Sequence, residues 1–410
     1  MLLLTEANWV HRRVETIDFL STELARRSTS VDLTVPEPFR AMLRIDDGQF
    51  VVPIATLAKR PLRNFDLRDE AGRAIPVLGR DHNGDIAHGA LIGLAELALE
   101  EAGLGSLTPQ TVAHLRAIAC GTREEADQTA GALIRAAEEG DAELAAVLED
   151  DWTFYLISLL ASSYILLAVV READTRRILK FAYDEGYDDS RSRLQRVRQG
   201  LGIAALTFQI NAPAAVRAAS YHAEIVIPEQ LRIEEAFLYD VEDLSIYGDA
   251  DIDADRGALY ASSLELSARP ALFVRLDAER AGLPTVAFAV SVVTASMLIL
   301  GAVVFKPDAT TGGPSVSVLL AASALFAGAV AQRGEHDLVQ RFFTHRRAVL
   351  VLTGVTALVA ASTLAFNASP HTIDVVWKTC AAAATVFASI LGYAYRRAVP
   401  MSRASSEEET

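Results

Sequence analysis

Four long apolar runs follow one another in the last third of the chain. They cover residues 285–305, 316–331, 348–366 and 373–395, and each approaches the roughly 17 to 25 residues that a bilayer-spanning helix requires. Asp374 and Lys378, in the first turns of the fourth run, are the only Asp, Glu, Lys or Arg residues inside them. The pattern predicts four transmembrane helices that form a C-terminal bundle.

Short runs of alternating apolar and polar residues are frequent before these helices. Residues 31–35 and 221–227 show the alternation most clearly, and a period of two is typical of a half-buried strand. Further candidate strands lie at residues 50–57, 62–67, 74–78, 203–210, 231–239, 257–262 and 271–276. Short strands at such spacing favour a sandwich or a partial barrel.

Two stretches leave alternatives open. Residues 9–27 fit either a helix or a strand that pairs back onto residues 31–35, and we favour the hairpin. Residues 152–170 carry no charge, so they fit either a fifth membrane span or a buried helix that leads into a hairpin. We favour the buried helix, because serines and tyrosines interrupt the run and a charged turn and a second apolar segment follow it.

The composition changes at Ala87. From there to residue 161 the chain is rich in Ala, Leu and Glu, with apolar residues at helical spacing. Thr108-Pro109 and Thr122 are typical helix starts. Asn83-Gly84, shortly before, is a strong signal for a type I′ turn, because both residues tolerate positive φ. We therefore expect a turn at Asn83-Gly84 and a helical insertion after it.

These patterns predict an α+β membrane protein. We expect a β-rich, sandwich-like domain in two parts, residues 1–86 and 164–283, with a helical insertion at residues 87–163. Residues 284–396 carry the four-helix transmembrane bundle, and residues 397–410 form a polar, acidic tail. The join before residue 284 contains no flexible linker, which indicates that the domain is mechanically tied to the bundle.

Basic residues flank the apolar runs unevenly. The first connection has only Lys306, and the third has no basic residue. The second connection and the segment after the fourth run carry seven arginines: Arg333, Arg341, Arg346, Arg347, Arg396, Arg397 and Arg403. Because Lys and Arg near the ends of spans stay on the cytoplasmic side, we expect a cell (inner) membrane protein whose two termini and soluble domain are cytoplasmic.

Charge divides the chain into two regions. Residues 284–410 hold 9 Lys+Arg and 7 Asp+Glu, which gives a net charge of +2. The other 29 Lys+Arg and 46 Asp+Glu lie in residues 1–283, whose net charge is −17. Nucleic-acid backbones select Lys and Arg, so we expect no nucleic-acid partner. The two cysteines, Cys120 and Cys380, do not make a disulfide framework. The first residues lack the basic and small-residue pattern of a signal peptide, and none is expected.

Small residues recur at four-residue spacing in two of the apolar runs. Ala324 and Gly328 form one ridge, and Ala384, Ala388 and Gly392 form another, a pattern that allows close helix contact. We interpret the ridges as packing within one bundle, with homo-oligomerisation as the alternative. The runs lack the central charge that ion transport usually requires.

Two weak candidates for a metal site occur in the soluble region. The first is an acidic run with alternating carboxylates at Asp249, Asp251, Asp253 and Asp255. Compared with an EF-hand loop, this run has Arg256 at the glycine position, so we interpret it as a solvated loop.

The second candidate is a pair of histidines, His82 and His88, which flank Asn83-Gly84 together with two aspartates. Imidazoles and carboxylates are metal ligands, but we interpret this cluster as part of an exposed hairpin. Motifs for the common cofactors, such as G-x-x-x-x-G-K-[ST] or G-x-G-x-x-G after a strand, are absent. We therefore expect no metal, no cofactor and no catalytic residue.

Two further features concern the membrane surface. Phe342 and Phe343 lie in the basic second connection, which indicates a segment that runs along the inner membrane surface. A local basic patch follows the acidic residues 184–189 and consists of Arg191, Arg193, Arg196 and Arg198. We interpret this patch as a solvated face that neutralises itself, with contact to lipid headgroups or an acidic partner as the alternative.

The basic residues are nearly all arginine, alanine is abundant, and a β-rich region precedes four apolar runs. This combination resembles uncharacterised multi-pass membrane proteins of actinobacteria, and the resemblance implies no particular activity. Our leading hypothesis is a non-enzymatic, membrane-anchored sensing or scaffolding protein whose domain binds a partner protein or a small ligand. The alternatives are an oligomeric channel or membrane-perturbing effector gated by that domain, and an unrecognised enzyme.

Overall fold

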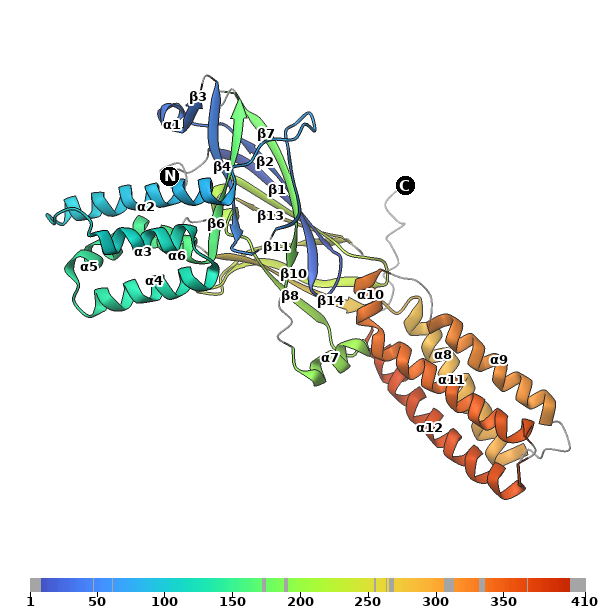
Figure 1. Cartoon of the computed structure of the whole chain (residues 1–410). Coiled ribbons are helices and arrows are strands. Elements are labelled where there is room, and N and C mark those ends of the chain that lie inside the picture. The colour runs from blue at the N-terminus through green and yellow to red at the C-terminus, as the bar shows by residue number, and fades with distance from the viewer. Residues whose placement is uncertain are drawn as a thin grey trace.

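The structure is a computed structural model. It describes residues 9–46, 48–60, 62–171, 175–187, 191–253, 256–262, 264, 269–305, 313–331, 336–366 and 368–398. Three regions follow one another in space: a lobe of helices, a β-rich region and a group of long helices (Figure 1). The chain is therefore an α+β protein with a β-rich N-terminal domain and C-terminal helices.

The strands form three sheets. The first has seven strands in the order β12 (Asp251–Asp253), β13 (Arg256–Ser262), β9 (Ser220–Val226), β1 (Val10–Phe19), β2 (Leu24–Leu33), β7 (Arg177–Gly186) and β5 (Arg63–Arg68). The second has the order β11 (Ile246–Asp249), β10 (Leu231–Asp240), β14 (Pro270–Ala278) and β8 (Leu206–Asn211). The third consists of β3 (Arg44–Asp46), β4 (Gln49–Ala58) and β6 (Ser163–Arg171). Only β1 and β9 pair in parallel among the described strands.

The favoured hairpin near the N-terminus is confirmed, but its register differs from the prediction. Ile17 pairs with Arg27, and Val31 pairs with Arg13, whereas we expected Ile17 to lie opposite residues 31–35. The chain reverses tightly before Leu24, whose carbonyl accepts from the amides of Leu20 and Ser21. This early reversal lets β1 pair with β2 from Val10 to Phe19, with one register shift between Val10 and Arg12.

One face of the first sheet is covered by both other sheets. Alternate residues of β2 are buried on this face, as the period of a strand requires. Ala25 belongs to a core that includes the second sheet, whereas Val31 and Leu33 belong to a core that includes the third sheet. Arg27 and Thr29 are buried between them. Polar groups therefore divide two apolar cores.

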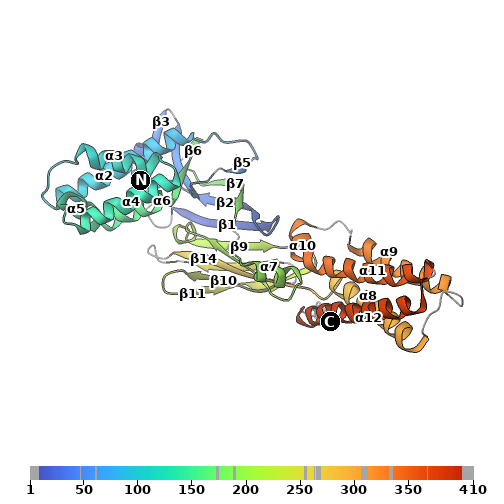
Figure 2. The same ribbon diagram turned by 60° about the horizontal axis from the view of Figure 1, so that its bottom comes forward.

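The helical lobe lies between β5 and β6 in sequence. Its helices are α2 (Arg80–Glu101), α3 (Pro109–Cys120), α4 (Arg123–Glu138), α5 (Ala142–Glu149) and α6 (Asp151–Ser162). Thr108 and Thr122 cap α3 and α4 as predicted, since each side chain accepts from a backbone amide of the first turn. Ile165 and Leu167 of β6 pack on the lobe, while Leu166 and Ala168 face the first sheet. The third sheet thus lies between the helical lobe and the first sheet (Figure 2).

The predicted turn at Asn83-Gly84 is wrong, because α2 begins at Arg80 and contains both residues. The side-chain amide of Asn83 donates to the carbonyl oxygen of Leu78 at 2.9 Å. This hydrogen bond connects the first turn of the helix to the preceding segment. A Cβ at Gly84 would lie 2.8 Å from Cys120 Sγ. Glycine here allows α2 to approach α3 closely, and the lobe begins before the predicted residue 87.

Residues 152–170 do not form a fifth span, since α6 ends at Ser162 and β6 follows. The expected helix and two strands occur, but the expected hairpin does not. Strand β6 pairs with β4 in the third sheet, and β7 pairs with β2 and β5 in the first. Residues 74–78, predicted as a strand, form only isolated bridges at Ala74 and Val77.

The C-terminal region contains α8 (Leu283–Leu300), which continues as a π-helical turn, Gly301–Phe305, then α9 (Gly313–Ala331), α10 (Asp337–Phe342), α11 (Thr344–Ala365) and α12 (Pro370–Arg397). Three of the described helical segments are long and apolar enough to cross a membrane: Leu283–Val304, Thr344–Ala365 and Pro370–Arg397. The apolar part of α9, Ser315–Ala331, is shorter. These helices indicate a membrane protein.

The β-rich domain and the C-terminal helices share one hydrophobic core. Phe342 and Phe343 are buried in this core, together with Leu206 and Leu276 of the second sheet. The two side chains therefore do not face a membrane surface, and the expected course of the second connection along that surface stays a prediction. Their rings fill the junction between the two regions, where α10 leads into α11.

Polar contacts also hold this junction together. Arg280, between β14 and α8, donates from Nε to the carbonyl oxygen of Ala398 at 2.8 Å and lies over the ring of Tyr395. Arg341 of α10 pairs with Glu23 in the β1–β2 turn at 3.0 Å. The short join and these contacts fix the end of the helices against the domain.

Candidate functional site

A pocket of about 600 Å³ opens between the helical lobe and the sheets. It lies where the end of β4, the start of β6, the start of α2 and the α3–α4 turn meet. Its apolar wall includes Leu62, Phe65, Val77, Leu78, Leu160 and Ile165. A volume of this size suits a small molecule.

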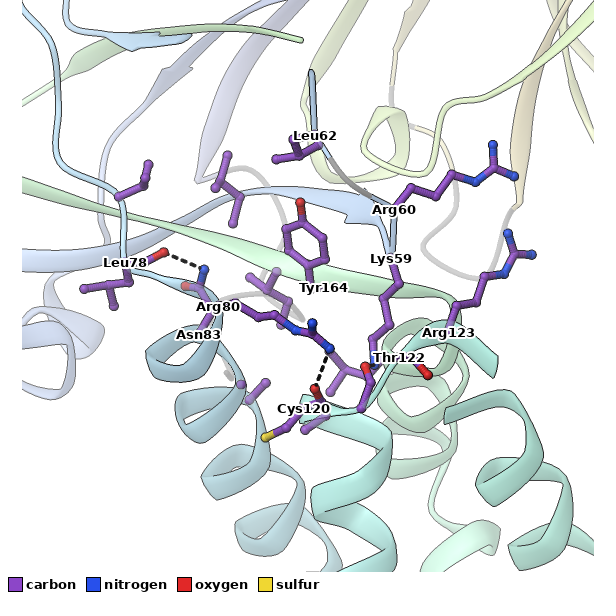
Figure 3. Close-up of a pocket in the computed structure, with 18 of the residues that line it drawn as sticks. Lys59, Arg60, Leu62, Leu78, Arg80, Asn83, Cys120, Thr122, Arg123 and Tyr164 are labelled. Atoms are coloured by element: carbon purple, nitrogen blue, oxygen red, sulfur yellow. Dashed lines mark hydrogen bonds between the residues drawn. The ribbon is translucent and has the colours of Figure 1, made fainter. Parts of the chain in front are cut away.

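Four cations line this pocket: Lys59, Arg60, Arg80 and Arg123. No Asp or Glu is among the described residues of its wall. The excess of positive charge stands out because residues 1–283 carry a net charge of −17. Figure 3 shows Lys59 and Arg80 directed toward the end of α3, with the guanidinium groups of Arg60 and Arg123 extended on one side.

Lys59 and Arg80 bind the C-terminal end of α3. Lys59 Nζ donates to the carbonyl oxygen of Ile118 at 2.6 Å and to that of Gly121 at 3.2 Å. Arg80 donates to the carbonyl oxygen of Cys120 at 3.2 Å. Cations are favourable at a helix C-terminus, where carbonyls lack intrahelical partners. Carbonyls carry no net charge, so both side chains remain cationic while bound.

Burial and the nearby Arg80 lower the pKa of Lys59 to about 8. The ammonium group is therefore mostly charged at neutral pH and loses its charge about two pH units below an ordinary lysine.

The remaining polar groups of the pocket are neutral. Burial raises the pKa of Tyr164 to about 12, and burial also raises the pKa of the Cys120 thiol, so neither is an activated nucleophile. The side-chain oxygen of Asn83 is buried without a hydrogen-bond partner among the described residues. Asn83 thus offers an acceptor at the pocket wall. These groups can bind and orient a ligand, but they form no nucleophile–base pair.

Two carboxylates of α4 lie close enough to influence Lys59 without lining the pocket. Glu125 accepts from the amide and hydroxyl of Thr122 at 2.9 Å each in the capping box of α4. Asp127 lies 3.7 Å from Arg123 on the same helix, and both side chains are about half exposed. An exposed pair at this distance compensates charge weakly.

A second polar centre lies on the buried face of the first sheet. Glu15 accepts from Arg13 at 3.1 Å, from Arg27 at 2.9 Å and from the hydroxyl of Tyr221 at 2.8 Å. Burial raises the pKa of Glu15, but the two guanidinium groups and the hydroxyl outweigh it and lower the pKa to about 2. Glu15 is therefore ionised across the physiological range.

This buried cluster connects the three sheets. Arg13 donates to the carbonyl oxygen of Ile54 in the third sheet at 3.4 Å. Arg27 donates to that of Asn211 in the second sheet at 3.1 Å and to Glu185 of β7 at 2.9 Å. The charged groups of the cluster are buried and paired with one another, so we assign the cluster a structural role.

The histidines suggested as metal ligands are not brought together. Both lie on α2, where His82 is exposed and His88 contacts the carbonyl oxygen of Val112 on α3 at 3.2 Å. The two histidines are six residues apart on the helix, and at 3.6 residues per turn their side chains point to different faces. Within the described part of the chain, no group of three or more His, Cys, Asp or Glu is arranged to hold a metal.

The acidic run forms two short edge strands, where a solvated loop was predicted. Asp249 is in β11, and Asp251 and Asp253 are in β12, all three exposed. Strand β12 pairs with β13 through Asp253 and Arg256, because the Ile252 side chain packs against the core. Asp255 lies outside the described residues.

The arginines proposed to set topology gather at the domain end of the helices. Arg341 pairs with Glu23, Arg346 donates to the carbonyl oxygen of Leu201, and Arg397 donates to the hydroxyl of Tyr393. Arg347 follows Arg346 in the first turn of α11, and Arg396 precedes Arg397 at the end of α12. Arg333 lies outside the described residues.

The small residues proposed for helix packing have different surroundings. Ala384 is fully buried, and Ala388 packs against the same core. A Cβ at Gly392 would lie 2.9 Å from the ring of Phe288 on α8. Two further sites are on α9: Ala324 lies close to Gly354 of α11, whereas Gly328 has open space where a Cβ would be.

The pocket cations were missed by sequence reasoning. Lys59, Arg80 and Arg123 are separated by more than twenty residues from one another, and each stands at the boundary of an element. The only local signal was a basic residue next to the expected end of a strand or start of a helix. No known family model matches the chain, and no curated protein matches it.

Proposed function

We propose that this chain is a membrane-anchored sensing protein whose domain binds an anionic small molecule with an apolar body. The observation that carries the proposal is the pocket with four cations and no carboxylate among its described lining residues. Its apolar wall suits a ring or a short chain, and its cations suit a phosphate, sulfonate or carboxylate. The pKa values of Tyr164 and Cys120 are raised, so neither is an activated nucleophile, and binding is the function we favour.

The membrane arrangement is part of this proposal. We infer a four-helix transmembrane bundle in which α9 is the fourth span, because its apolar part, Ser315–Ala331, has about the minimum length for crossing a bilayer. The β-rich region would be a sandwich-like domain. We place it in the cytoplasm at the cell membrane, because the flanking arginines gather at the domain end of the helices and positive charge is retained inside.

A sensing role is supported by the junction. The β-rich domain joins the helices through a shared core and through Arg280 and Arg341, so the two regions are in direct contact. A ligand that draws the helical lobe toward the sheets would therefore change the shape of a domain that is in direct contact with the membrane helices. A flexible tether would not offer this connection.

Binding of a matched pair of probes tests the proposed site. In nanodiscs of zwitterionic lipid, the full chain is expected to bind 1-naphthyl phosphate at least about tenfold more tightly than neutral 1-naphthol, because charge-assisted hydrogen bonds contribute roughly 1.5–3 kcal/mol each. Arg123→Gln should weaken phosphate binding without disturbing the lobe, since Arg123 is exposed and does not bind α3. Arg116→Gln is the matched control, because Arg116 is an exposed arginine of α3 that pairs with Asp85 of α2 at 3.0 Å and is not among the residues that line the pocket.

The pH dependence provides a second readout. Binding of 1-naphthyl phosphate should weaken between pH 7 and pH 9, because Lys59 loses its charge through a pKa of about 8 while the phosphate keeps its charge. Equal affinity for the two probes, or equal weakening by Arg116→Gln and Arg123→Gln, would contradict the proposed anion site.

A further inference from the structure

Helix α7 (Arg193–Gly200) lies beside the domain end of the membrane helices (Figures 1 and 2). Its first turn is held by a capping box between Ser192 and Gln195. Its last residues pack against the start of α11: a Cβ at Gly200 would collide with His345, and Arg346 donates to the carbonyl oxygen of Leu201 at 3.0 Å. The helix is thus fixed at the level where the predicted span begins.

The outer face of α7 combines apolar and basic side chains. Leu194 is 69% exposed and Val197 39% exposed, and they lie one turn apart on the same face. Arg193 and Arg196 lie on the neighbouring stripe, both exposed. Neither forms an ion pair with any residue that the structure describes. The exposed apolar residues and the two arginines together give α7 the amphipathic, basic face that is typical of helices on a membrane surface.

The described acidic residues before α7 do not neutralise this face. Asp184 pairs with Arg26 at 2.8 Å, and Glu185 pairs with Arg27 at 2.9 Å. Both carboxylates belong to the first sheet and bind arginines of β2. These two carboxylates therefore do not support our interpretation that the charges of residues 184–198 neutralise one another.

We propose that α7 lies on the membrane surface and binds anionic phospholipid headgroups. Arg193 and Arg196 contact the headgroups, while Leu194 and Val197 enter the boundary between headgroups and acyl chains. Two observations select lipid over an acidic protein: the helix packs directly on the first turn of α11, and Arg341, Arg396 and Arg397 lie at the same end of the helices. A bilayer around α11 brings headgroups within reach of α7.

The expected strength follows from the charge. Each arginine close to an anionic surface contributes about fivefold to the occupancy of the surface-bound state, so two arginines contribute about 25-fold. The contribution is screened by salt, because the Debye length falls to roughly 3 Å at 1 M ionic strength. The two exposed apolar side chains add a contribution that does not depend on salt.

Hydrogen–deuterium exchange of the full chain in nanodiscs tests this proposal. Wild-type amides of residues 193–201 should exchange several-fold more slowly in nanodiscs with 30% phosphatidylglycerol than in purely phosphatidylcholine nanodiscs. High salt should reduce this difference. The Arg193→Gln/Arg196→Gln double variant should lose it, and Leu194→Gln should reduce protection in both kinds of nanodisc.

Two controls separate lipid binding from general effects. Arg12→Gln removes an exposed arginine from the end of β1 far from the Glu23–Arg341 contact, and Leu244→Gln removes a leucine that is 70% exposed in the β-rich domain. Neither should alter exchange in α7. Equal wild-type exchange in the two kinds of nanodisc would overturn the proposal, as would lipid-dependent protection that survives the double arginine substitution.

Discussion

The most constrained residue of the β-rich domain is Glu15. Its carboxylate is buried between two arginines on the face that separates two apolar cores. A buried charge is tolerated only when it is paired and hydrogen-bonded. Glu15 meets this condition through Arg13, Arg27 and Tyr221, and the arginines extend the cluster to the other two sheets. The cluster thereby specifies how the three sheets assemble.

Replacing this carboxylate should destabilise the domain strongly. Glu15→Gln leaves Arg13 buried without a carboxylate among the described residues, whereas Arg27 keeps Glu185. Loss of one partner of a buried pair costs about 3–5 kcal/mol, and we expect about 3 kcal/mol in the free energy of unfolding, measured by urea titration in nanodiscs. Glu224→Gln, which breaks a half-exposed contact with Arg256 at 3.6 Å, should cost under about 1 kcal/mol. Similar losses for both variants would contradict the structural role of Glu15.

Acid should act through the same group. The folded pKa of Glu15 is about 2 and the unfolded value is 4.5, so the unfolded chain binds a proton first as the pH falls. The stabilisation from Glu15 is present above pH 4.5 and is lost progressively as the pH falls toward 2. Urea midpoints at pH 5, 4 and 3 should therefore fall less steeply for Glu15→Gln than for the wild type. Parallel slopes would count against this assignment.

Asp277 should act in the opposite direction. Burial and the neighbouring Glu234 raise its pKa from 3.8 to about 6, so the folded chain binds a proton before the unfolded chain does. Lowering the pH from 7 to 4 should stabilise the protein through this group. The Asp277→Asn variant should remove this rise in the urea midpoint. An unchanged rise would show that another group is responsible.

At the scale of elements, α2 shows why local signals can mislead. Asn83-Gly84 has the residues of a tight turn, yet both occur in the first turns of a helix. Glycine is needed there because Cys120 of α3 approaches to within 2.8 Å of where a Cβ would be. The requirement comes from tertiary packing, which no local pattern contains.

Substitution of the glycines of α2 should separate packing from helix propensity. Gly84→Ala should lower the thermal unfolding midpoint of the lobe, corresponding to about 1–3 kcal/mol of overpacking. Gly93→Ala, on the same helix with open space around it, should raise the midpoint slightly because alanine favours helix by roughly 0.5–1 kcal/mol. Adding Cys120→Ala to Gly84→Ala should restore part of the loss. If both alanine variants raise the midpoint equally, the close contact is absent.

The elements that could be predicted are those with a clear period. Strand β9, the start of α3 at Thr108 and the start of α4 at Thr122 follow directly from alternation and capping residues. Apart from the β1–β2 hairpin, pairing partners could not be predicted, since β6 and β7 are neighbours in sequence but lie in different sheets. The pocket was equally hidden, because Lys59, Arg80 and Arg123 meet only after the lobe folds onto the third sheet.

At the scale of the whole molecule, the protein combines a fixed junction with two surfaces of positive charge in an acidic chain. The pocket cations lie between the lobe and the sheets, and the α7 arginines lie beside the membrane helices. The apolar helices indicate a membrane protein, and we propose that the arginines at the junction hold the domain on the cytoplasmic side. Both proposed ligands, a small anion and anionic lipid, would then be reached from the cytoplasm.

Protease accessibility of residues 1–283 tests the proposed orientation most directly. The full chain would be treated in right-side-out vesicles and in inside-out vesicles, and fragments would be followed with antibodies to the domain. The domain should be cleaved only in inside-out vesicles, with the helices of residues 283–397 retained in the membrane. Cleavage of the domain in intact right-side-out vesicles would place it outside and contradict the account.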